Sequence, residues 1–445
     1  MDVDAEHRRL VSDPEGQPRD VGVAAEPRQV IAAEPRHVVV VGAGPAGLMA
    51  AEVAAAAGLR VTIVERMPSA GRKLLMAGRG GLNLTHSEDL ESFLARYGAS
   101  RPLVEAAIRA FPPSALIAWA EALGQPTFIG SSGRVFPRAM KASPLLRAWL
   151  ARLEASGVVL RTRHRLLALR PDRTLTLEGP DGARTELAAD AVVLALGGAS
   201  WPRLGSDGRW TNLLAAVGVD LRPLEASNVG VAIAWSPQTV ERFAGTPLKR
   251  IAVRCGTHTQ RGEAIVTRAG LEGGAIYALS PALRDALGQT ATATLLLDLR
   301  PDIEPAALAA RLAGARKRDS RSNMLRKAAQ LSPAAIAVLR DAMANDLPAD
   351  PAVLAALIKA VPLRVSGLTD LDRAISSAGG IAGHEVDPHF MLRKLPGVFV
   401  AGEMIDWDAP TGGYLMQASL ATGFVAGRGV AEHLGGGRQT RLHAK

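Results

Sequence analysis

Cysteine and aromatic residues are scarce in this chain of 445 residues. It has one cysteine, Cys255, and aromatic side chains make up 4% of the sequence. A single cysteine excludes an internal disulfide and is typical of reducing compartments, so we expect a cytoplasmic location. The low aromatic content argues against a stacking platform for single-stranded nucleic acid. Nine scattered histidines show no metal-ligand spacing, so we expect no metal site.

A segment that could cross a membrane is also lacking. Residues 38–59 form the one long hydrophobic run, with Glu52 as its only charge. Three glycines and a proline near its start favour a buried strand, a tight turn and a helix instead. The first thirty residues have no apolar core of the signal-peptide kind. We therefore expect neither membrane insertion nor secretion.

The composition describes an ordinary globular chain with an excess of positive charge. Hydrophobic residues make up 48% and charged residues 21%, and 52 Lys and Arg against 43 Asp and Glu give a net charge of +9. This balance suits anionic ligands such as dinucleotides and leaves nucleic acid open. Basic residues occur along the whole chain, and the basic run at residues 311–327 is interpreted as a solvated helical face rather than a nucleic-acid patch.

One segment, residues 37–66, organises the sequence. Four valines lead into Gly42-Ala43-Gly44-Pro45-Ala46-Gly47, an alanine-rich run follows, and a second apolar stretch ends at Glu65. This order predicts a strand, turn, helix and strand that bind an adenine dinucleotide. Gly42 allows the turn, Gly44 lets the backbone approach a pyrophosphate, and Gly47 allows close helix packing. The helix N-terminus favours phosphate, and Glu65 can accept hydrogen bonds from ribose.

Two later segments have a composition that suits a flat phosphorylated ligand. Residues 69–86 contain four glycines together with Arg72, Lys73 and Arg79. Near the C-terminus, a predicted strand ends at Gly402-Glu403, and a Gly-rich turn precedes a helix predicted from about Leu415 to His433. An acid that can hold a polyol and a helix N-terminus that stabilises negative charge are the features that a flavin needs.

The coarse pattern predicts an α/β chain with a discontinuous dinucleotide-binding domain. Polar alternating strands after residue 157 indicate a three-stranded antiparallel meander in place of a crossover helix. Short alternating strands followed by helices indicate an insert with a barrel-like and a helical part. Ser143-Pro144 is expected to begin a helix with Ser143 as its N-cap. The predicted divisions are a disordered leader at 1–35, a first segment at 36–200, the insert at 201–362, a second segment at 363–435 and a flexible tail at 436–445.

These motifs, in this order, resemble the BaiN-like (also called YhiN-like) FAD-dependent oxidoreductases, some of which are labelled the aminoacetone oxidase family. The resemblance covers His37 to the final helix. It implies a Rossmann-type FAD-binding domain interrupted by an insert. The motifs that carry it are GAGPAG at 42–47, GRKLLMAGRGGLNLTH at 71–86, RVFPRAMKAS at 134–143, LALGGASWPRLGSDG at 194–208, AGLEGGAIYALS at 269–280 and VFVAGEMIDWDAPTGGYLMQASLATG at 398–423.

The chain departs from the family pattern at three positions, in two motifs, that bear on chemistry. Leu82 stands before Asn83 where the family often has cysteine, and Arg268 and Glu272 replace a histidine and a serine of the insert motif. Weak candidates for catalysis are therefore His86, Arg268, Trp407 and Tyr414. The residues expected to bind FAD are Gly42, Ala43, Gly44, Pro45, Ala46, Gly47, Glu65, Arg66, Arg72, Lys73, Gly80, Leu82, Asn83, Leu196, Gly197, Gly402, Glu403, Gly412, Gly413 and Tyr414.

The sequence therefore predicts an FAD-dependent oxidoreductase that exchanges a hydride between flavin N5 and a small organic substrate. NAD(P)H is a possible transient electron source, because no second GxGxxG with a following acid is present. Two alternatives stay open: an FAD protein that binds or modifies RNA, and a non-catalytic flavin sensor. The oligomeric state cannot be deduced from the sequence.

Overall fold

The structure is a computed structural model that describes residues 35–316 and 318–435. The predicted leader, apart from Pro35, and the predicted tail lie outside the described residues. Within the described part, two large hydrophobic cores form, one around a parallel sheet and one in the insert.

The first core contains a five-stranded parallel sheet in the order β20-β10-β1-β2-β6. The central strand β1 is almost entirely apolar and fully buried, as expected for a parallel strand covered on both faces. The strands are β1 (His37–Val41), β2 (Arg60–Glu65), β6 (Val159–Thr162), β10 (Ala191–Leu194) and β20 (Val398–Val400). The predicted Rossmann-type α/β fold is therefore confirmed.

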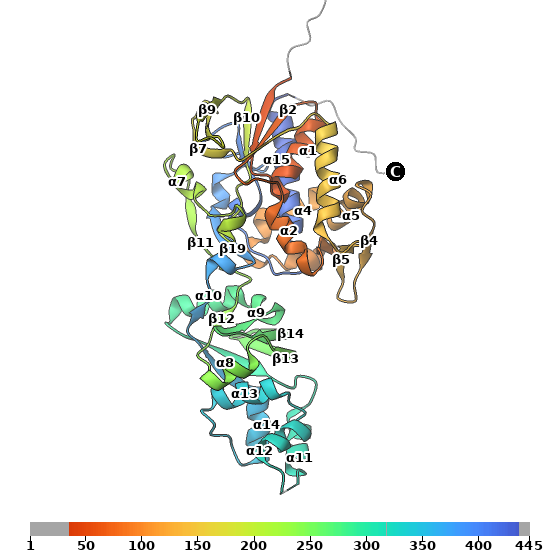
Figure 1. Ribbon diagram of the computed structural model, residues 1–445, viewed down its shortest axis with the longest axis vertical. Helices are drawn as coiled ribbons and strands as arrows, with labels where there is room; N and C mark the ends of the chain where they lie inside the picture. Colours follow the sequence, from red (N-terminus) through yellow and green to blue (C-terminus); the bar gives the residue numbers. More distant parts are fainter. Residues whose placement is uncertain (1–34, 317, 436–445) are drawn as a thin grey trace, which may run out of the picture. The chain divides into compact units, whose positions relative to one another are not determined.

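Two helices far apart in sequence, α1 (Pro45–Ala56) and α15 (Tyr414–His433), pack side by side against this sheet (Figure 1). Glycine makes the close approach possible. A Cβ at Gly423 would lie 2.3 Å from the Ala46 carbonyl oxygen, and one at Gly427 would lie 2.8 Å from that of Ala50. The C-terminal helix thus holds the two halves of the discontinuous domain together.

The meander predicted between β6 and β10 is present. Strands β7 (Arg165–Leu169), β8 (Leu175–Glu178) and β9 (Arg184–Leu187) form an antiparallel sheet in sequence order. Its two turns are closed by backbone hydrogen bonds from Arg170 to Thr174 and from Gly179 to Ala183. Because β10 then pairs with β1 in parallel, the meander takes the place of a crossover helix.

A helical region and a small sheet lie between β2 and β6. The sheet, in the order β3-β5-β4, pairs residues of the Gly-rich loop with the segment 134–137. The predicted N-cap at Ser143 is wrong, because α6 begins at Ala142 with Lys141 as its N-cap and no side-chain cap. The elements are α2 (Arg72–Ala77), β3 (Thr85–His86), α3 (Leu90–Ala95), α4 (Arg101–Ala110), α5 (Pro113–Ala122), β4 (Thr127–Ile129), β5 (Arg134–Pro137) and α6 (Ala142–Ala155).

The insert contains a seven-stranded sheet in the order β17-β16-β13-β14-β15-β12-β18. Its two outermost strands, β17 and β18, are consecutive in the chain and separated only by Ser366. One bent segment therefore pairs with both ends of the sheet, which gives the barrel-like closure that was predicted. The strands are β12 (Val231–Ala232), β13 (Pro247–Cys255), β14 (His258–Val266), β15 (Gly270–Glu272), β16 (Ala293–Asp298), β17 (Val361–Val365) and β18 (Gly367–Leu368).

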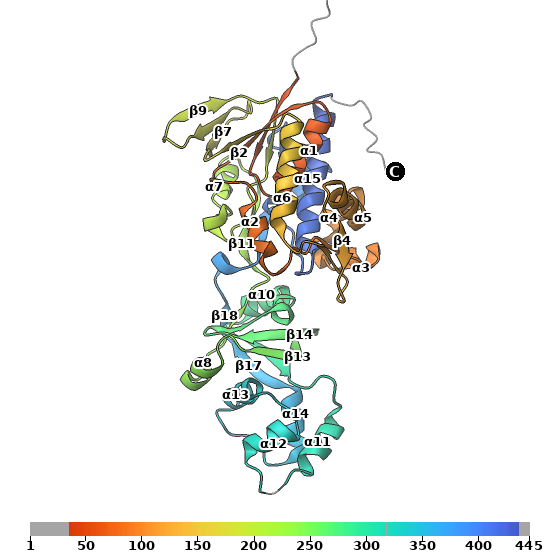
Figure 2. The same ribbon diagram turned by 45° about the vertical axis from the view of Figure 1, so that its right-hand side comes forward.

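Helices complete the insert, and those formed by residues 305–359 lie near one another beside the sheet (Figure 2). Their starts follow from sequence, since Ser332 and Asp350 each accept a backbone hydrogen bond at an N-cap that precedes proline. The helices are α8 (Pro237–Phe243), α9 (Gly274–Tyr277), α10 (Ser280–Gln289), α11 (Pro305–Ala313), α12 (Arg321–Lys327), α13 (Pro333–Ala342) and α14 (Pro351–Lys359).

The two cores divide the chain differently from the predicted boundaries at 201 and 362. Trp210, in α7 (Trp210–Ala215), and Val219 pack in the first core, whereas Leu363 and Val365 pack in the second. The change occurs at a two-stranded antiparallel sheet of β11 (Leu221–Ser227) and β19 (Ser376–Ile381). By packing, the insert therefore starts near residue 230 and ends near residue 369.

Candidate functional site

A cavity of about 300 Å³ opens at the carboxyl ends of the parallel strands. It is lined by residues that follow β1, β2, β10 and β20, together with α2 and the meander strand β7. The carboxyl edge of an open parallel sheet is where α/β proteins bind their ligands. The volume falls in the range of small-molecule and cofactor sites.

The glycines of the 42–47 motif have separate structural roles. Gly42 has φ +107°, and a Cβ there would lie 2.2 Å from the Ala195 carbonyl oxygen. A Cβ at Gly47 would lie 2.0 Å from the Gly42 carbonyl oxygen, so this glycine permits the close packing of α1. Gly44 lines the cavity, and a Cβ there would meet no protein atom within 4 Å. Gly42 and Gly47 therefore serve the fold, and Gly44 leaves space in the cavity.

Glu65 fixes the end of β2 beside the cavity. One carboxylate oxygen accepts a hydrogen bond from the backbone N–H of Ala43 at 2.8 Å, and the other accepts one from Met67 at 2.8 Å. Because Ala43 belongs to the glycine motif, Glu65 ties the turn after β1 to the end of β2. The carboxylate lines the cavity where a ribose hydroxyl can donate to it.

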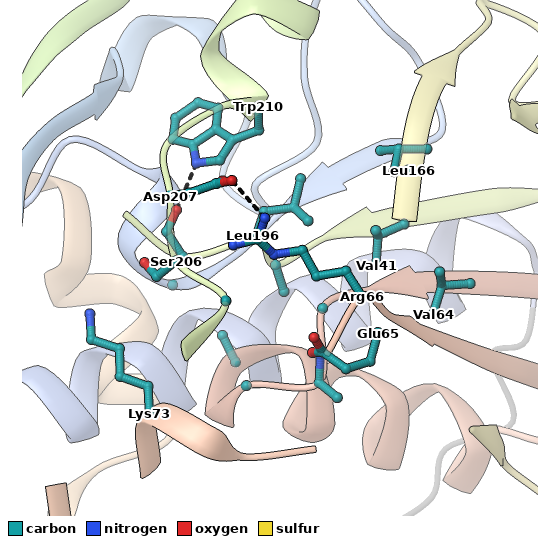
Figure 3. Close-up of a pocket in the computed structure, with 18 of the residues that line it drawn as sticks. Val41, Val64, Glu65, Arg66, Lys73, Leu166, Leu196, Ser206, Asp207 and Trp210 are labelled. Carbon is teal, nitrogen blue, oxygen red and sulfur yellow. Dashed lines mark hydrogen bonds and ion pairs between the residues drawn. The ribbon is translucent and has the colours of Figure 1, made fainter. Parts of the chain in front are cut away.

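Arg66 extends from the same strand end toward the loop after β10 (Figure 3). Its guanidinium pairs with Asp207 at 2.6 Å and donates to the carbonyl oxygen of Pro202 at 3.2 Å. The same loop carries Trp210, whose indole N–H donates to the Gly197 carbonyl oxygen at 2.7 Å. These bonds hold the loop at residues 202–210 as one wall of the cavity.

Three buried polar atoms in the cavity wall have no hydrogen-bond partner within the described part of the chain. They are Nε of Arg66, Nε of Arg72 and Oγ of Ser206. Buried polar groups are nearly always paired, so unpaired ones at one cavity indicate a polar ligand. Two guanidinium groups, the N-terminus of α1 and the open space at Gly44 suit a pyrophosphate. The residues present therefore fit an adenine dinucleotide such as FAD.

Lys73 and Glu403 join the two sequence segments across the cavity. The Lys73 ammonium lies 2.6 Å from the Glu403 carboxylate and donates to the Ser200 hydroxyl at 2.7 Å. Both side chains line the cavity and are mostly buried. The predicted loop and the predicted strand-end acid thus meet in one place.

The cavity brings together most of the residues expected to bind FAD, and leaves some outside. Gly47 is covered by the packing of α1, and Gly80, Leu82, Asn83, Gly412, Gly413 and Tyr414 are not in the cavity wall. The expected residues that line it are Gly42, Ala43, Gly44, Pro45, Ala46, Glu65, Arg66, Arg72, Lys73, Leu196, Gly197, Gly402 and Glu403.

The expected residues outside the cavity wall form a second contact between the two segments. A Cβ at Gly413 would lie 2.6 Å from the backbone of Thr85, so the turn before α15 rests directly on β3. The Thr85 hydroxyl donates to the Gln417 amide oxygen at 2.8 Å. Near this contact in sequence, Asn83 has a buried amide oxygen with no partner in the described part of the chain. This corner therefore also has an unfilled acceptor.

Tyr414, a weak catalytic candidate, is held inside the fold by an aromatic contact and a hydrogen bond. Its ring lies 4.8 Å from that of Phe93, and its hydroxyl donates to Glu88 at 2.5 Å. Burial, followed by the bond to Glu88, raises the pKa of the Tyr414 hydroxyl well above its ordinary value. Burial alone would raise the pKa of Glu88, but hydrogen bonds from Arg96 and Tyr414 outweigh it and lower that pKa. The phenol thus stays protonated against an ionised carboxylate.

His86 and Trp407 are likewise held by hydrogen bonds inside the fold. The His86 ring stacks on Tyr414 at 5.7 Å, with one ring nitrogen 2.9 Å from the Ser132 carbonyl oxygen and the other accepting from the Glu88 N–H. Trp407 is 2% exposed and donates to the Gly402 carbonyl oxygen at 2.9 Å. Neither residue lines the cavity.

Arg268, the fourth candidate, is exposed and lies between β14 and β15 of the insert. Within the described residues no ion pair joins it to Glu272, the other departure from the insert motif. Glu272 instead points toward the start of the insert, because a Cβ at Gly230 would lie 2.6 Å from its Cγ.

Part of the cavity wall was not predicted. His164, Arg165, Leu166 and Leu167 line it from the meander, and Ser206, Asp207 and Trp210 line it from the loop after β10. Meander strands alternate polar and apolar residues whether or not they face a cavity. The sequence therefore gives no local signal that this meander lines one. The loop at 202–210 had one signal, since it contains the LGSDG stretch, residues 204–208, that ends a family motif.

Two features are absent from residues 35–316 and 318–435. No helix there is long and apolar enough to cross a membrane. No group of three or more His, Cys, Asp or Glu side chains there could hold a metal ion.

Comparison with known proteins agrees with this site. The family model described as the HI0933-like protein Rossmann domain matches residues 36–429. A 3-dehydro-bile acid delta(4,6)-reductase of Clostridium scindens is 26% identical over 411 residues, which cover 88% of this chain and 98% of the relative. A ribosomal RNA dihydrouridine synthase of Escherichia coli K12 is 24% identical over 395 residues, which cover 85% and 94%.

Solved structures share the fold. A flavocytochrome c3 fumarate reductase in an open conformation matches with a TM-score of 0.50 and 18% identity, over 90% of this chain and 79% of that one. A 3-ketosteroid delta1-dehydrogenase of Sterolibacterium denitrificans also matches with a TM-score of 0.50, at 14% identity over 89% and 99%. The chain therefore belongs to the HI0933-like Rossmann-domain family and is an FAD-dependent oxidoreductase.

Proposed function

We propose that the protein reduces a carbon–carbon double bond conjugated to a carbonyl group, with NAD(P)H as the electron source. The observation that carries the proposal is the FAD-type cavity, which both sequence segments build. Its wall contains three buried polar atoms that have no hydrogen-bond partner among the described residues. The names of both curated relatives describe addition of hydrogen to such a bond. A delta(4,6)-reductase of a 3-dehydro steroid saturates an enone, and dihydrouridine is uridine with a saturated pyrimidine bond.

Bound FAD would supply a hydride from N5 to the β-carbon of the acceptor. The protein's own residues hold the cofactor: Arg72 and the N-terminus of α1 suit its pyrophosphate, and Glu65 suits a ribose. Lys73 and Glu403 close the cavity between the two segments. These groups would fix the position of the bound cofactor.

A proton must reach the α-carbon of the acceptor, and a thiol beside the flavin does not supply it here. Leu82 is 1% exposed at the position where the family often has cysteine. The single cysteine, Cys255, lies in β13 within the second core, and burial raises the pKa of its thiol. We therefore propose that solvent or a polar group of the substrate provides the proton.

The reductant is expected to bind only transiently. The sequence has one GxGxxG motif followed by an acid, and FAD accounts for it. NAD(P)H must therefore deliver its hydride through a short-lived complex. We further propose a cytoplasmic location, which the single cysteine supports.

Anaerobic mixing tests the proposal. The FAD-loaded protein is mixed with NADH or NADPH, and the visible flavin absorption is followed until it bleaches. An excess of an enone such as 4-androstene-3,17-dione is then added without oxygen. Bleaching followed by return of the colour supports the reductase. A flavin that no nicotinamide reduces would favour a non-catalytic sensor.

A second candidate function is reduction of uridine in RNA. A curated relative named as a ribosomal RNA dihydrouridine synthase covers 85% of this chain and favours it. In the same experiment, return of colour on addition of a uridine-containing RNA, and not of the enone, would identify this substrate. Mass spectrometry of the recovered RNA would show a gain of two hydrogens per modified uridine.

A further inference from the structure

Most of the net positive charge of the chain lies in the insert, although basic residues occur along the whole sequence. Residues 230–369 contain 18 Lys and Arg against 11 Asp and Glu, so they carry +7 of the net +9. Some of these cations are satisfied locally. Lys359 pairs with Asp298 at 2.8 Å, Arg261 with Asp302 at 2.7 Å and Lys327 with Asp319 at 3.1 Å.

Another group of cations gathers around one anchored arginine. Arg300 donates to the carbonyl oxygens of Ala329 and Gln330 at 2.9 and 3.0 Å, and to the Gln330 amide oxygen at 3.0 Å. Burial, and then repulsion from Arg250 and Arg311, lowers the pKa of Arg300. The charges of Arg250 and Arg311 thus act on Arg300, and Arg250 lines the same cavity as Arg300.

The strand β13 directs two further cations to the same place. Its pairing with β14 shifts register between Leu248 and Ile251, so Lys249 and Arg250 occupy a bulge, and Arg250 has φ +52°. A β-bulge re-aims side chains, and a non-glycine residue at positive φ is kept only where the surroundings require it. Both side chains are exposed, and they line a cavity of about 310 Å³ together with Arg300.

The acids near this cavity do not neutralise the cations. Asp302 lines it but pairs with Arg261, and Asp298 pairs with Lys359. Within the described part of the chain, the side chains of Lys249, Arg250 and Arg311 make no ion pair. A cluster of like charges is unfavourable unless an anion binds it. Arginine is the residue best suited to phosphate oxygens.

We propose that Lys249, Arg250 and Arg311, arranged around Arg300, form a surface that binds the phosphate backbone of RNA. The inference rests on the second candidate function, for which the insert would hold the polynucleotide while one base reaches the flavin. A lipid surface fits less well, because Ile265 and Val353 are the only large exposed hydrophobic residues among the described residues of the insert.

The test measures binding as salt is varied. The probe is a synthetic stem–loop RNA with uridines in its loop, and the protein is the full FAD-loaded chain. The variant carries Lys249→Ala, Arg250→Ala and Arg311→Ala. A matched control carries Arg109→Ala, Arg170→Ala and Arg428→Ala, which remove the same charge from exposed ion pairs outside both the insert and the cavity wall.

Each lost phosphate contact lowers the slope of log K against log salt by roughly 0.7 to 0.9. We expect the insert variant to lose about two units of slope and at least tenfold in affinity at low salt, and the control to lose less than half a unit. Equal losses in the two variants would overturn the proposal, because net charge alone would then explain binding. Binding of phosphatidylglycerol vesicles in place of RNA would overturn it as well.

Flavin bleaching by NAD(P)H, measured on the same preparations, separates this inference from the proposed function. A wild-type protein that reduces an enone but binds no RNA contradicts only the RNA surface. A protein that binds RNA through these residues but whose flavin is never reduced contradicts only the reductase.

Discussion

The Lys73 ammonium lies 2.6 Å from the Glu403 carboxylate, although 330 residues separate the two in sequence. Lys73 comes from the first turn of α2, and Glu403 from the short helical turn after β20. Both line the cavity. This ion pair links the two segments of the discontinuous domain at the point where the cofactor is expected.

We expect Lys73→Ala to weaken FAD binding by tenfold or more, about 1.4 kcal/mol, because it removes a cation from the cavity and leaves Glu403 unpaired. Fluorescence titration of apoprotein with FAD measures the change. The control is Lys394→Ala, which breaks a 2.7 Å pair with Glu385 away from the cavity. Equal affinities for the two variants would show that the Lys73–Glu403 pair has no part in cofactor binding.

Two glycines of the same motif should respond differently to alanine. Gly44→Ala meets no protein atom and keeps an allowed φ of −81°, so we expect unchanged folding but at least tenfold weaker FAD binding. Gly42→Ala places a Cβ 2.2 Å from the Ala195 carbonyl oxygen at φ +107°, so we expect a loss of stability above about 2 kcal/mol.

Urea unfolding and FAD titration of both variants check these expectations. Gly288→Ala, at an open helical position in the insert, is the control for the substitution itself. Equally tight FAD binding by Gly44→Ala and the wild type would mean that the cofactor does not lie against this turn.

Tyr414→Phe tests whether this residue is structural or catalytic. Loss of the 2.5 Å hydrogen bond to Glu88 should cost about 1–2 kcal/mol in free energy of unfolding, with the reductase rate unchanged. The bond helps to hold the folded pKa of Glu88 below its ordinary value of 4.5. Its contribution is therefore complete above pH 4.5 and is lost as the pH falls through the lowered folded pKa.

The stabilities of Tyr414→Phe and wild type should therefore converge as the solution is acidified from neutral pH. Thermal unfolding across that range measures the difference. A large fall in turnover with unchanged stability would assign Tyr414 a catalytic role instead.

Cys255→Ala tests the absence of thiol chemistry. The side chain is 4% exposed in the second core, and burial raises the pKa of its thiol. We expect a stability loss of about 1 kcal/mol from the small cavity, and no change in flavin reduction or in reoxidation by the acceptor. Loss of turnover with FAD still bound would mean that the thiol takes part.

Local patterns predicted the parts of the site in which one short segment sets the geometry. Residues 37–66 specify a strand, a turn, a helix and a strand by spacing alone, and the structure places Gly42, Gly44 and Glu65 accordingly. The loop with Lys73 and the strand ending at Glu403 were also recognised, because glycines and charges are concentrated there. Lys73 and Glu403, which come from distant segments of the chain, do lie at one cavity.

Features set by tertiary packing escaped prediction. Nothing in the sequence shows that Leu166 of the meander faces the cavity, or that Trp407 is covered by the fold. The change of core does not coincide with the predicted insert boundaries at 201 and 362, since Trp210 joins the first core and Leu363 the second, and both cores form from segments far apart in the chain. The composition of the sequence does not show at which residue the chain passes from the first hydrophobic core to the second.

The central claim is that both segments enclose one FAD that passes electrons from NAD(P)H to a conjugated double bond. Anaerobic stopped-flow measurement of the flavin colour tests it most directly, with nicotinamide added first and an enone or a uridine-containing RNA second. The account predicts one FAD per chain, bleaching by NADH or NADPH, and return of colour with one of the two acceptors. A purified protein that is colourless and binds no added FAD would contradict it.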